Sequence, residues 1–366
     1  MAQCKDGRPG VGKLVVDDIF RGDLRRTLSR DLHDLYDFYV DDETRARVGR
    51  MGRLRRWFTA GTWIVKSMLL RLSPARRVLL AAALILLLFT TVQIRTEHFR
   101  LGGGNATASF FLVLIVLLLE LKDKLLAHDE LQVGRAVQIA LMPTENPRLA
   151  GWDIWLLTRP ANEVGGDLVD YLWLQPDRRL ALVVGDVVGK GLGAALLMAK
   201  LQATVRAFTG EVASLAELGA RVNRILCRDG IKGRFATLLY LEVASDSGAL
   251  RLLNAGHPPP ILLQDGALST LRPTALPVGA KADAKFVEQT LDVAPGGLVM
   301  LYSDGVTEAR NRERDLFGDK RLAELVAGLS GVSAEEAGGR LLAAVDAFAG
   351  EAPPSDDLSL VVLRRV

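Results

Sequence analysis

Four aspartates beside short apolar runs are the residues of this chain best suited to chemistry. Three adjoin a glycine, Asp167 in EVGGD, Asp186 in LALVVGDVVGKG and Asp304 in LVMLYSDGVTEARN, and the fourth, Asp356, begins the block DDLSLVVL. An aspartate at a strand end, beside glycines that let a backbone come close, is a common oxygen ligand for a hard divalent cation. Any one of these aspartates alone would usually be a turn residue. The set of four predicts one carboxylate cluster assembled from distant parts of the sequence.

The available side chains favour Mg²⁺ or Mn²⁺ at such a cluster, because both ions prefer carboxylates, carbonyls and water. Two ions about 4 Å apart can share an oxygen and stabilise both ends of an in-line displacement. The chain has four histidines, and only His257 lies in the region of the aspartates, which disfavours a zinc site built from histidine. The two cysteines, Cys4 and Cys227, are far apart in the sequence, so neither a disulfide framework nor a thiolate metal site is predicted.

The elements that must position the aspartates are mostly short strands. From Trp152 onward, apolar runs alternate with turns in DIWLLTRP, DYLWL, RLALVVGDV, ATLLYLEV, LRLLNAGHPP, PILLQDG, GGLVMLYSDG and LSLVVLRRV. Helical patterns interrupt them at Gly193–Thr209, Ser214–Arg228, Gly318–Leu329 and Ser333–Phe348. Strands in clusters with helices inserted in pairs predict an α+β fold, in which two sheets pack together under outer helices.

The first part of the chain is apolar enough to predict membrane attachment. Mean hydropathy is +0.20 over 366 residues, and residues 78–94 and 102–121 are each long enough for a bilayer span, the first only just. We therefore expect a two-helix transmembrane hairpin, with two buried core helices as the alternative. From Arg45 to Arg77 there are ten Lys or Arg and no acidic residue, which predicts that both termini are cytoplasmic. These basic residues could also attract anionic lipid, or serve as a topology signal alone; they do not indicate nucleic-acid binding.

Four segments follow from these patterns. Residues 1–56 are a polar, partly helical cytoplasmic segment, and 57–121 contain a juxtamembrane helix and the two spans. Residues 122–143 form a linker helix, and 144–366 form the catalytic domain. The linker helix has a ragged heptad pattern, so it could support a homodimer or be a plain helix packed on the domain.

From Val133 to the C-terminus the sequence resembles the metal-dependent protein phosphatase (PPM) superfamily. Within it, the chain looks most like the bacterial stage-II-sporulation phosphatase (SpoIIE-like) branch. The matching blocks occur in family order across about 230 residues: RAVQIALMP, RPANEVGGDLVDY, GDVVGKGLGAA, FATLLY, NAGHPP, YSDGVTEARN, LFG and DDLSLV.

The resemblance implies an α-β-β-α four-layer sandwich with two Mn²⁺ or Mg²⁺ ions at one edge of its sheets. By motif position, Asp186 would bridge both metals and the carbonyl of Val187 would bind one of them. Asp304 and Asp356 would hold the second metal, with Asp167 alongside as a ligand or through water. Asp357 competes with Asp356 for the last position, and adjacent aspartates cannot be separated by sequence.

The implied activity is hydrolysis of phosphoserine or phosphothreonine on a signalling protein, by metal-activated water and without a phospho-enzyme. In this branch the substrate is an anti-sigma-factor antagonist, and the predicted location is the cytoplasmic membrane with the catalytic domain in the cytoplasm. A catalytically inactive scaffold that binds phosphorylated partners is the alternative, although retention of every predicted aspartate argues against it. A two-metal nucleotide cyclase is disfavoured because the chain has no P-loop or Rossmann pattern.

Overall fold

The computed structural model describes residues 72–91, 95–96, 99–100, 104–176, 178–230, 233–245 and 247–366, together with residues 62, 66 and 69. The chain divides into two compact units, Met1–Leu125 and Leu126–Val366. The predicted helix within residues 1–56 lies outside the described residues, as does almost all of the predicted juxtamembrane helix.

The first unit contains a pair of antiparallel helices, α5 (Pro74–Thr91) and the beginning of α6 (Gly104–Leu141). The hydroxyl of Ser109, in α6, donates a hydrogen bond of 2.8 Å to the carbonyl of Ala83, near the middle of α5. At the start of α5, Arg76 donates to Glu120 of α6 at 2.6 Å. Between the helices lie two antiparallel two-residue strands, β1 (Arg95–Thr96) and β2 (Phe99–Arg100).

The predicted transmembrane hairpin is not supported by this part of the structure. Among the described residues, no helix combines the length and the apolar character that crossing a bilayer requires. Arg76 and Arg77 lie inside α5, which leaves residues 78–91 as its uncharged part, fewer than the roughly 17 residues of a minimal span. The second predicted span and the predicted linker helix are also not separate, because α6 runs through most of both, with no proline between Gly104 and Leu141.

The second unit contains two five-stranded antiparallel sheets. The first has the order β10-β7-β6-β5-β4, and its strands are β4 (Leu168–Gln175), β5 (Arg179–Val187), β6 (Ala236–Ala244), β7 (Ala249–Ala255) and β10 (Glu288–Asp292). The second has the order β3-β12-β11-β8-β9, and its strands are β3 (Trp152–Arg159), β8 (Ile261–Gln264), β9 (Ala267–Thr270), β11 (Leu298–Tyr302) and β12 (Leu358–Arg365).

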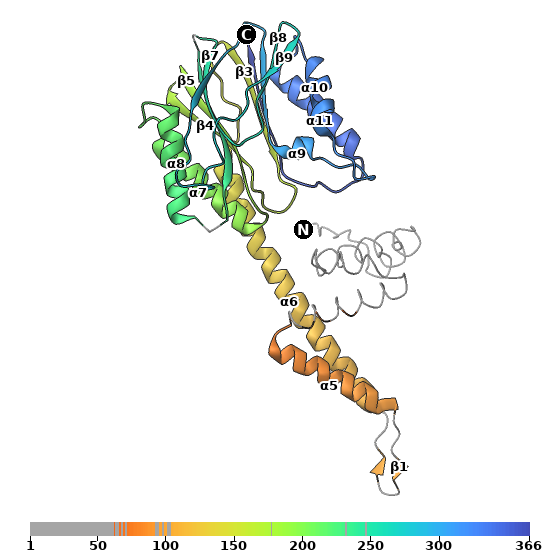
Figure 1. Cartoon of the computed structure of the whole chain (residues 1–366). Coiled ribbons are helices and arrows are strands. Elements are labelled where there is room, and N and C mark those ends of the chain that lie inside the picture. Colours follow the sequence, from red (N-terminus) through yellow and green to blue (C-terminus); the bar gives the residue numbers. More distant parts are fainter. Residues whose placement is uncertain are drawn as a thin grey trace, which may run out of the picture. The chain divides into compact units, whose positions relative to one another are not determined.

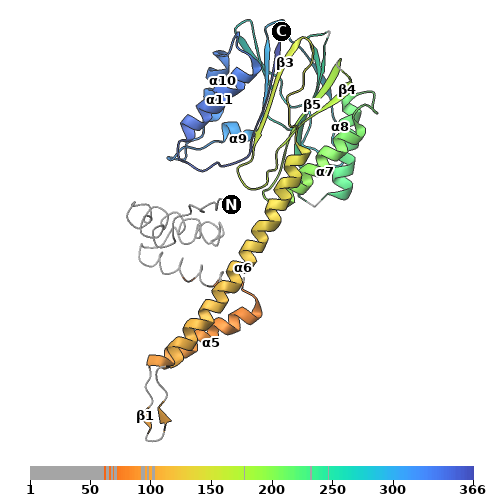
Figure 2. The same cartoon turned by 180° about the vertical axis from the view of Figure 1, so that it is seen from behind.

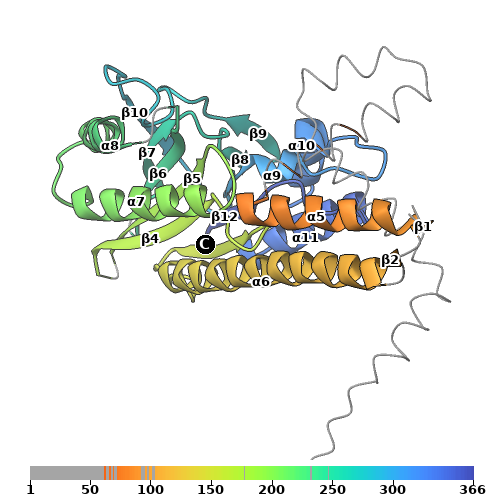
Figure 3. The same ribbon diagram turned by 90° about the horizontal axis from the view of Figure 1, so that it is seen from below.

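Five helices accompany the sheets: α7 (Leu192–Phe208), α8 (Leu215–Asp229), α9 (Asp304–Thr307), α10 (Gly318–Ala327) and α11 (Ala334–Ala349). Figures 1 and 2 show α7 and α8 beside the sheet that contains β4 and β5, and α10 and α11 on the other side of the domain. The view from below shows the same division of the helices (Figure 3).

Alternating side chains of β5 explain why helices cover one face of its sheet. Leu180, Leu182 and Val184 are buried in the core between the two sheets. Ala181 and Val183 point the other way, into the core that α7 and α8 form with this sheet, because successive strand residues face opposite sides. A third core joins α10 and α11 to the outer face of the second sheet. The predicted α-β-β-α sandwich is therefore confirmed.

The four longer helices of this unit coincide with the four helical patterns in the sequence to within one or two residues. Serines start two of them: the Ser214 hydroxyl accepts from the amide of Glu217, and the Ser333 hydroxyl accepts from the amide of Glu336. Strands β9 and β10 were not predicted. Both are short edge strands that lack a buried apolar run, so their residues show no strand pattern.

Candidate active site

The strand register brings the predicted aspartates to matching ends of two strand pairs. Leu168 pairs with Gly185 across β4 and β5, so Asp167 and Asp186 follow as neighbours at the end of this ladder. In the second sheet Tyr302 of β11 pairs with Leu360 of β12. Asp304 lies just beyond the end of β11, as the first residue of α9, and Asp356 lies just before β12. Residues from four separate segments thus meet at one edge of the sandwich.

Burial and nearby negative charge raise the pKa of three of these carboxylates, Asp167, Asp186 and Asp304. Asp167 is 3% exposed and its Oδ2 atom has no hydrogen-bond partner. Burial, followed by the charge of Asp186, raises the pKa of Asp167 well above its usual value. Burial also raises the pKa of Asp186 to about 6, with further contributions from Asp304 and the two aspartates 356 and 357. For Asp304, burial and then the charge of Glu308 raise the pKa.

The donor set suits a hard divalent cation. It offers carboxylate oxygens together with the main-chain carbonyl of Val187, and the buried Oδ2 of Asp167 has an unused acceptor position. Among the described residues, no three His, Cys, Asp or Glu side chains converge closely enough to form a ready ligand group. The carboxylates are therefore electrostatic neighbours rather than a preassembled coordination shell.

Asp356 and Asp357, which sequence could not distinguish, have different surroundings. Both carboxylate oxygens of Asp357 accept backbone hydrogen bonds, Oδ1 from the amide of Ala161 at 2.7 Å and Oδ2 from that of Gly166 at 2.5 Å. Asp357 is buried and ties the start of β12 to the loop before β4. The Asp356 carboxylate lies 3.1 Å from the ammonium of Lys190 and is partly exposed. Asp356 is consequently the more available of the two for a ligand.

Lys190 is a site residue that the sequence reasoning did not select. Its ammonium donates to the carbonyl of Ser355 at 2.7 Å in addition to its ion pair with Asp356. It belongs to the GDVVGKG block, so its position three residues after Val187 was the available signal. The lysine connects the loop after β5 to the loop before β12.

At Gly166 the loop before β4 passes close to the end of β5. A Cβ atom built on Gly166 would lie 3.1 Å from the carbonyl oxygen of Val187 and 3.5 Å from the Asp186 Oδ1 atom. A side chain at this position would therefore crowd two of the predicted ligands. The glycine pair before Asp167 has a steric reason in addition to turn formation.

The backbone of Asp186 is held by a polar pair, the half-buried Thr237 and the buried His257. The Asp186 amide donates to the Thr237 hydroxyl at 3.1 Å, and this hydroxyl lies 2.8 Å from Nδ1 of His257. Burial lowers the pKa of His257 to about 3, so its ring is neutral at physiological pH. The His257 amide donates to Asn254 at 2.9 Å, which agrees with a turn-forming role for NAGHPP. A buried neutral histidine is poorly suited to carry a proton in catalysis.

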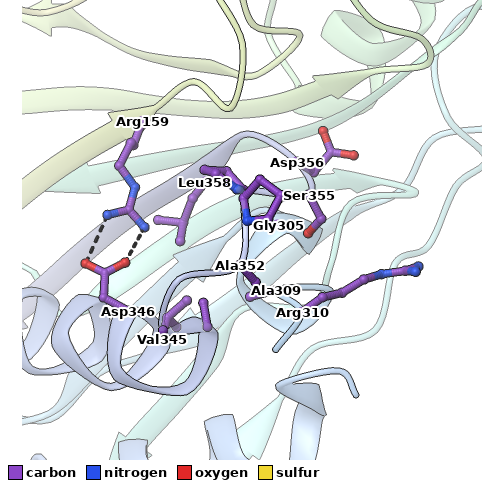
Figure 4. A pocket seen from close by; sticks show the side chains of 14 residues that line it. Arg159, Gly305, Ala309, Arg310, Val345, Asp346, Ala352, Ser355, Asp356 and Leu358 are labelled. Carbon is purple, nitrogen blue, oxygen red and sulfur yellow. Dashed lines mark hydrogen bonds and ion pairs between the residues drawn. The ribbon is translucent and has the colours of Figure 1, made fainter. Parts of the chain in front are cut away.

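A pocket of about 380 Å³ adjoins Asp356. Its lining includes Gly305, Asp356, Arg310 and the loop from Ala349 to Ser355 (Figure 4). Arg159 lies at the wall and donates two hydrogen bonds to Asp346 of α11, at 3.0 and 2.7 Å. Its guanidinium is thus engaged in a bidentate ion pair.

Comparison with known proteins gives a consistent family. A family profile described as Stage II sporulation protein E (SpoIIE) matches residues 176–366. Protein IcfG of Synechocystis sp. is 32% identical over 223 residues, which are 53% of this chain and 35% of that protein. Phosphoserine phosphatase RsbU of Bacillus subtilis is 25% identical over 184 residues, which are 50% of this chain and 54% of that protein. The chain thus spans about a third to a half of these relatives.

A solved structure supports the same relationship. The structure of the RsbU and RsbW domains of Rv1364c from Mycobacterium tuberculosis superimposes with a TM-score of 0.53 at 28% sequence identity. The match covers 62% of this chain and 63% of that chain. Since the family profile covers residues 176–366, more than half of the sequence, the chain belongs to the stage II sporulation protein E (SpoIIE) family.

Proposed function

We propose that this protein is a metal-dependent serine/threonine protein phosphatase. The observation that carries the proposal is the convergence of Asp167, Asp186, Asp304 and Asp356 on one edge of the sandwich, where burial raises the pKa of the first three. A site of this kind gains most from binding cations, because a cation removes the repulsion between the carboxylates. The names of its relatives, which include phosphoserine phosphatases, support this reading.

The residues take distinct roles in the proposal. Asp186 and the carbonyl of Val187 would hold one Mn²⁺ or Mg²⁺ ion, Asp186, Asp304 and Asp356 would hold a second, and Asp167 would bind directly or through water. When bound, such ions activate water and neutralise charge on the phosphoryl group. The chain itself supplies position: the Thr237 hydroxyl holds the Asp186 backbone, and Lys190 holds the Asp356 side chain.

The pocket beside Asp356 supports a protein substrate, because its volume of about 380 Å³ leaves room for residues that flank a phosphorylated serine or threonine. We propose a signalling phosphoprotein, with an anti-sigma-factor antagonist as the specific candidate that the family resemblance suggests. A homodimer through α6 stays a prediction.

Activity tests the proposal against the inactive-scaffold alternative. The full-length protein should hydrolyse p-nitrophenyl phosphate and a phosphoserine peptide with Mn²⁺, and chelator should abolish turnover. Asp186→Asn and Asp304→Asn should each reduce kcat by at least about 100-fold, because each removes a charged oxygen that the metals need. Asp283→Asn, at an exposed loop carboxylate paired with Lys281, is the matched control and should leave turnover unchanged.

Absence of turnover by the wild-type protein with either metal would favour the scaffold. Full activity in either site variant would contradict the ligand assignment.

Substitutions of the two adjacent aspartates, Asp356 and Asp357, should have different effects on stability and turnover. In chelator, Asp357→Asn should lower the free energy of unfolding by about 1–3 kcal/mol, because an asparagine amide cannot accept both buried backbone hydrogen bonds. Asp356→Asn should keep or slightly raise stability, since it removes one charge that repels Asp186, and yet it should lose Mn²⁺-dependent turnover. Denaturant unfolding and kinetics measure the two effects. Loss of turnover with unchanged stability in Asp357→Asn would reverse the assignment.

We further propose that the first unit holds the protein at the cytoplasmic membrane, in contact with lipid. Large apolar side chains on its helices are exposed, among them Val78 at 69%, Phe110 at 62% and Leu117 at 61%. Exposed apolar surface of this extent favours contact with lipid or with another protein. After cell fractionation the protein should stay with membranes through a high-salt wash and be released by detergent. Release by salt alone would contradict membrane attachment.

A further inference from the structure

We infer that Gln138, on the last turns of α6, is a positioning residue that sets the location of the Asp167 carboxylate and thereby the affinity of the site for Mn²⁺. The inference rests on the proposed function, in which Asp167 contributes to metal binding. It concerns residues of the second unit only, because Leu126 to Leu141 of α6 belong to that unit.

The Gln138 side chain makes a reciprocal pair of hydrogen bonds with one backbone residue. Its Nε2 atom donates to the carbonyl of Gly165 at 2.7 Å, and the amide of Gly165 donates to its Oε1 atom at 3.0 Å. Gln138 is 4% exposed, so these two bonds form away from water. Buried polar groups are costly to leave unpaired, and the side-chain amide therefore fixes Gly165, two residues before Asp167, in one place.

A second connection reaches the other side of Asp167. Gln202 of α7, also 4% exposed, donates from Nε2 to the carbonyl of Leu141 at 2.7 Å and to Asp170 at 3.0 Å. Asp170 is buried in β4, and Arg206 donates two hydrogen bonds to it, each of 2.7 Å. The end of α6 is therefore linked to β4 three residues after Asp167.

These connections hold the backbone on both sides of Asp167. Its Oδ2 atom has no hydrogen-bond partner, whereas the backbone on both sides is fixed by Gln138, by Asp357 at Gly166, and by Gln202. Close packing of the helix strengthens the link: a Cβ atom on Gly134, one turn before Gln138, would contact Leu192 at 3.4 Å. A change at Gln138 should consequently move the Asp167 segment without removing any predicted ligand.

Direct Mn²⁺ binding tests this role. Free Mn²⁺ is measured by electron paramagnetic resonance in titrations of full-length wild type, Gln138→Leu and Gln202→Leu, and turnover of p-nitrophenyl phosphate is followed over the same Mn²⁺ range. We expect Gln138→Leu to weaken Mn²⁺ binding at one site by about 10-fold or more, the range found when groups that orient metal ligands are removed. Saturating Mn²⁺ should recover most of the wild-type kcat, because the ligands themselves remain.

Gln289→Leu is the matched control, since Gln289 lies on edge strand β10 and its side chain donates to the carbonyl of Arg272. It should bind Mn²⁺ as the wild type does. If Gln138→Leu does not fold, Gln202→Leu carries the test, because it cuts the second connection and should weaken Mn²⁺ binding in the same direction.

Wild-type Mn²⁺ affinity in the folded variants, even with lower thermal stability, would overturn the inference and leave the proposed function intact. A wild-type protein that binds no Mn²⁺ would instead overturn the proposed function, and the positioning role with it.

Discussion

Repulsion between carboxylates at the ends of two strand pairs is the constraint on which the rest of this structure depends. Asp167 and Asp186 meet across β4 and β5, while Asp304 and Asp356 approach from the second sheet. The raised pKa values of Asp167, Asp186 and Asp304, that of Asp186 reaching about 6, express the cost of placing several acids where water is scarce. Folding energy elsewhere must hold them together, and a cation is the natural way to relieve that cost.

Hydrogen bonds and close contacts of the backbone, rather than contacts between the four candidate ligands, hold the strand ends of the site in place. Asp357 accepts two amides of the loop before β4 and so joins the sheets beside the site. Gly305 lets the start of α9 pass against the carbonyl of Asp357, where a Cβ atom would collide. The Ser303 hydroxyl accepts from the amide of Ser359 at 2.9 Å and binds the neighbouring strand ends. The ligands can thus be arranged for a cation because other residues fix the chain around them.

Much of this architecture could be predicted from sequence, since it depends on local patterns. The run RLALVVGDV predicts β5, because consecutive apolar residues place apolar side chains on both faces of a strand. Ser214 and Ser333 likewise mark the starts of two helices. The roles of Asp356 and Asp357 could not be predicted, because adjacent residues differ only in the tertiary contacts that each side chain makes. Gln138 was hidden for the same reason: its partner, Gly165, is 27 residues away. The fall in hydropathy between residues 121 and 122 predicts a boundary there. The helix α6 continues across this boundary.

Anomalous diffraction at the manganese edge, from crystals of the protein grown with Mn²⁺, tests the central claim most directly. We expect two manganese peaks at the edge of the sandwich, with Asp186 between them and the oxygens of Asp304 and Asp356 around one of them. Manganese bound elsewhere on the domain, or a site in which Asp186 contacts no metal, would contradict it.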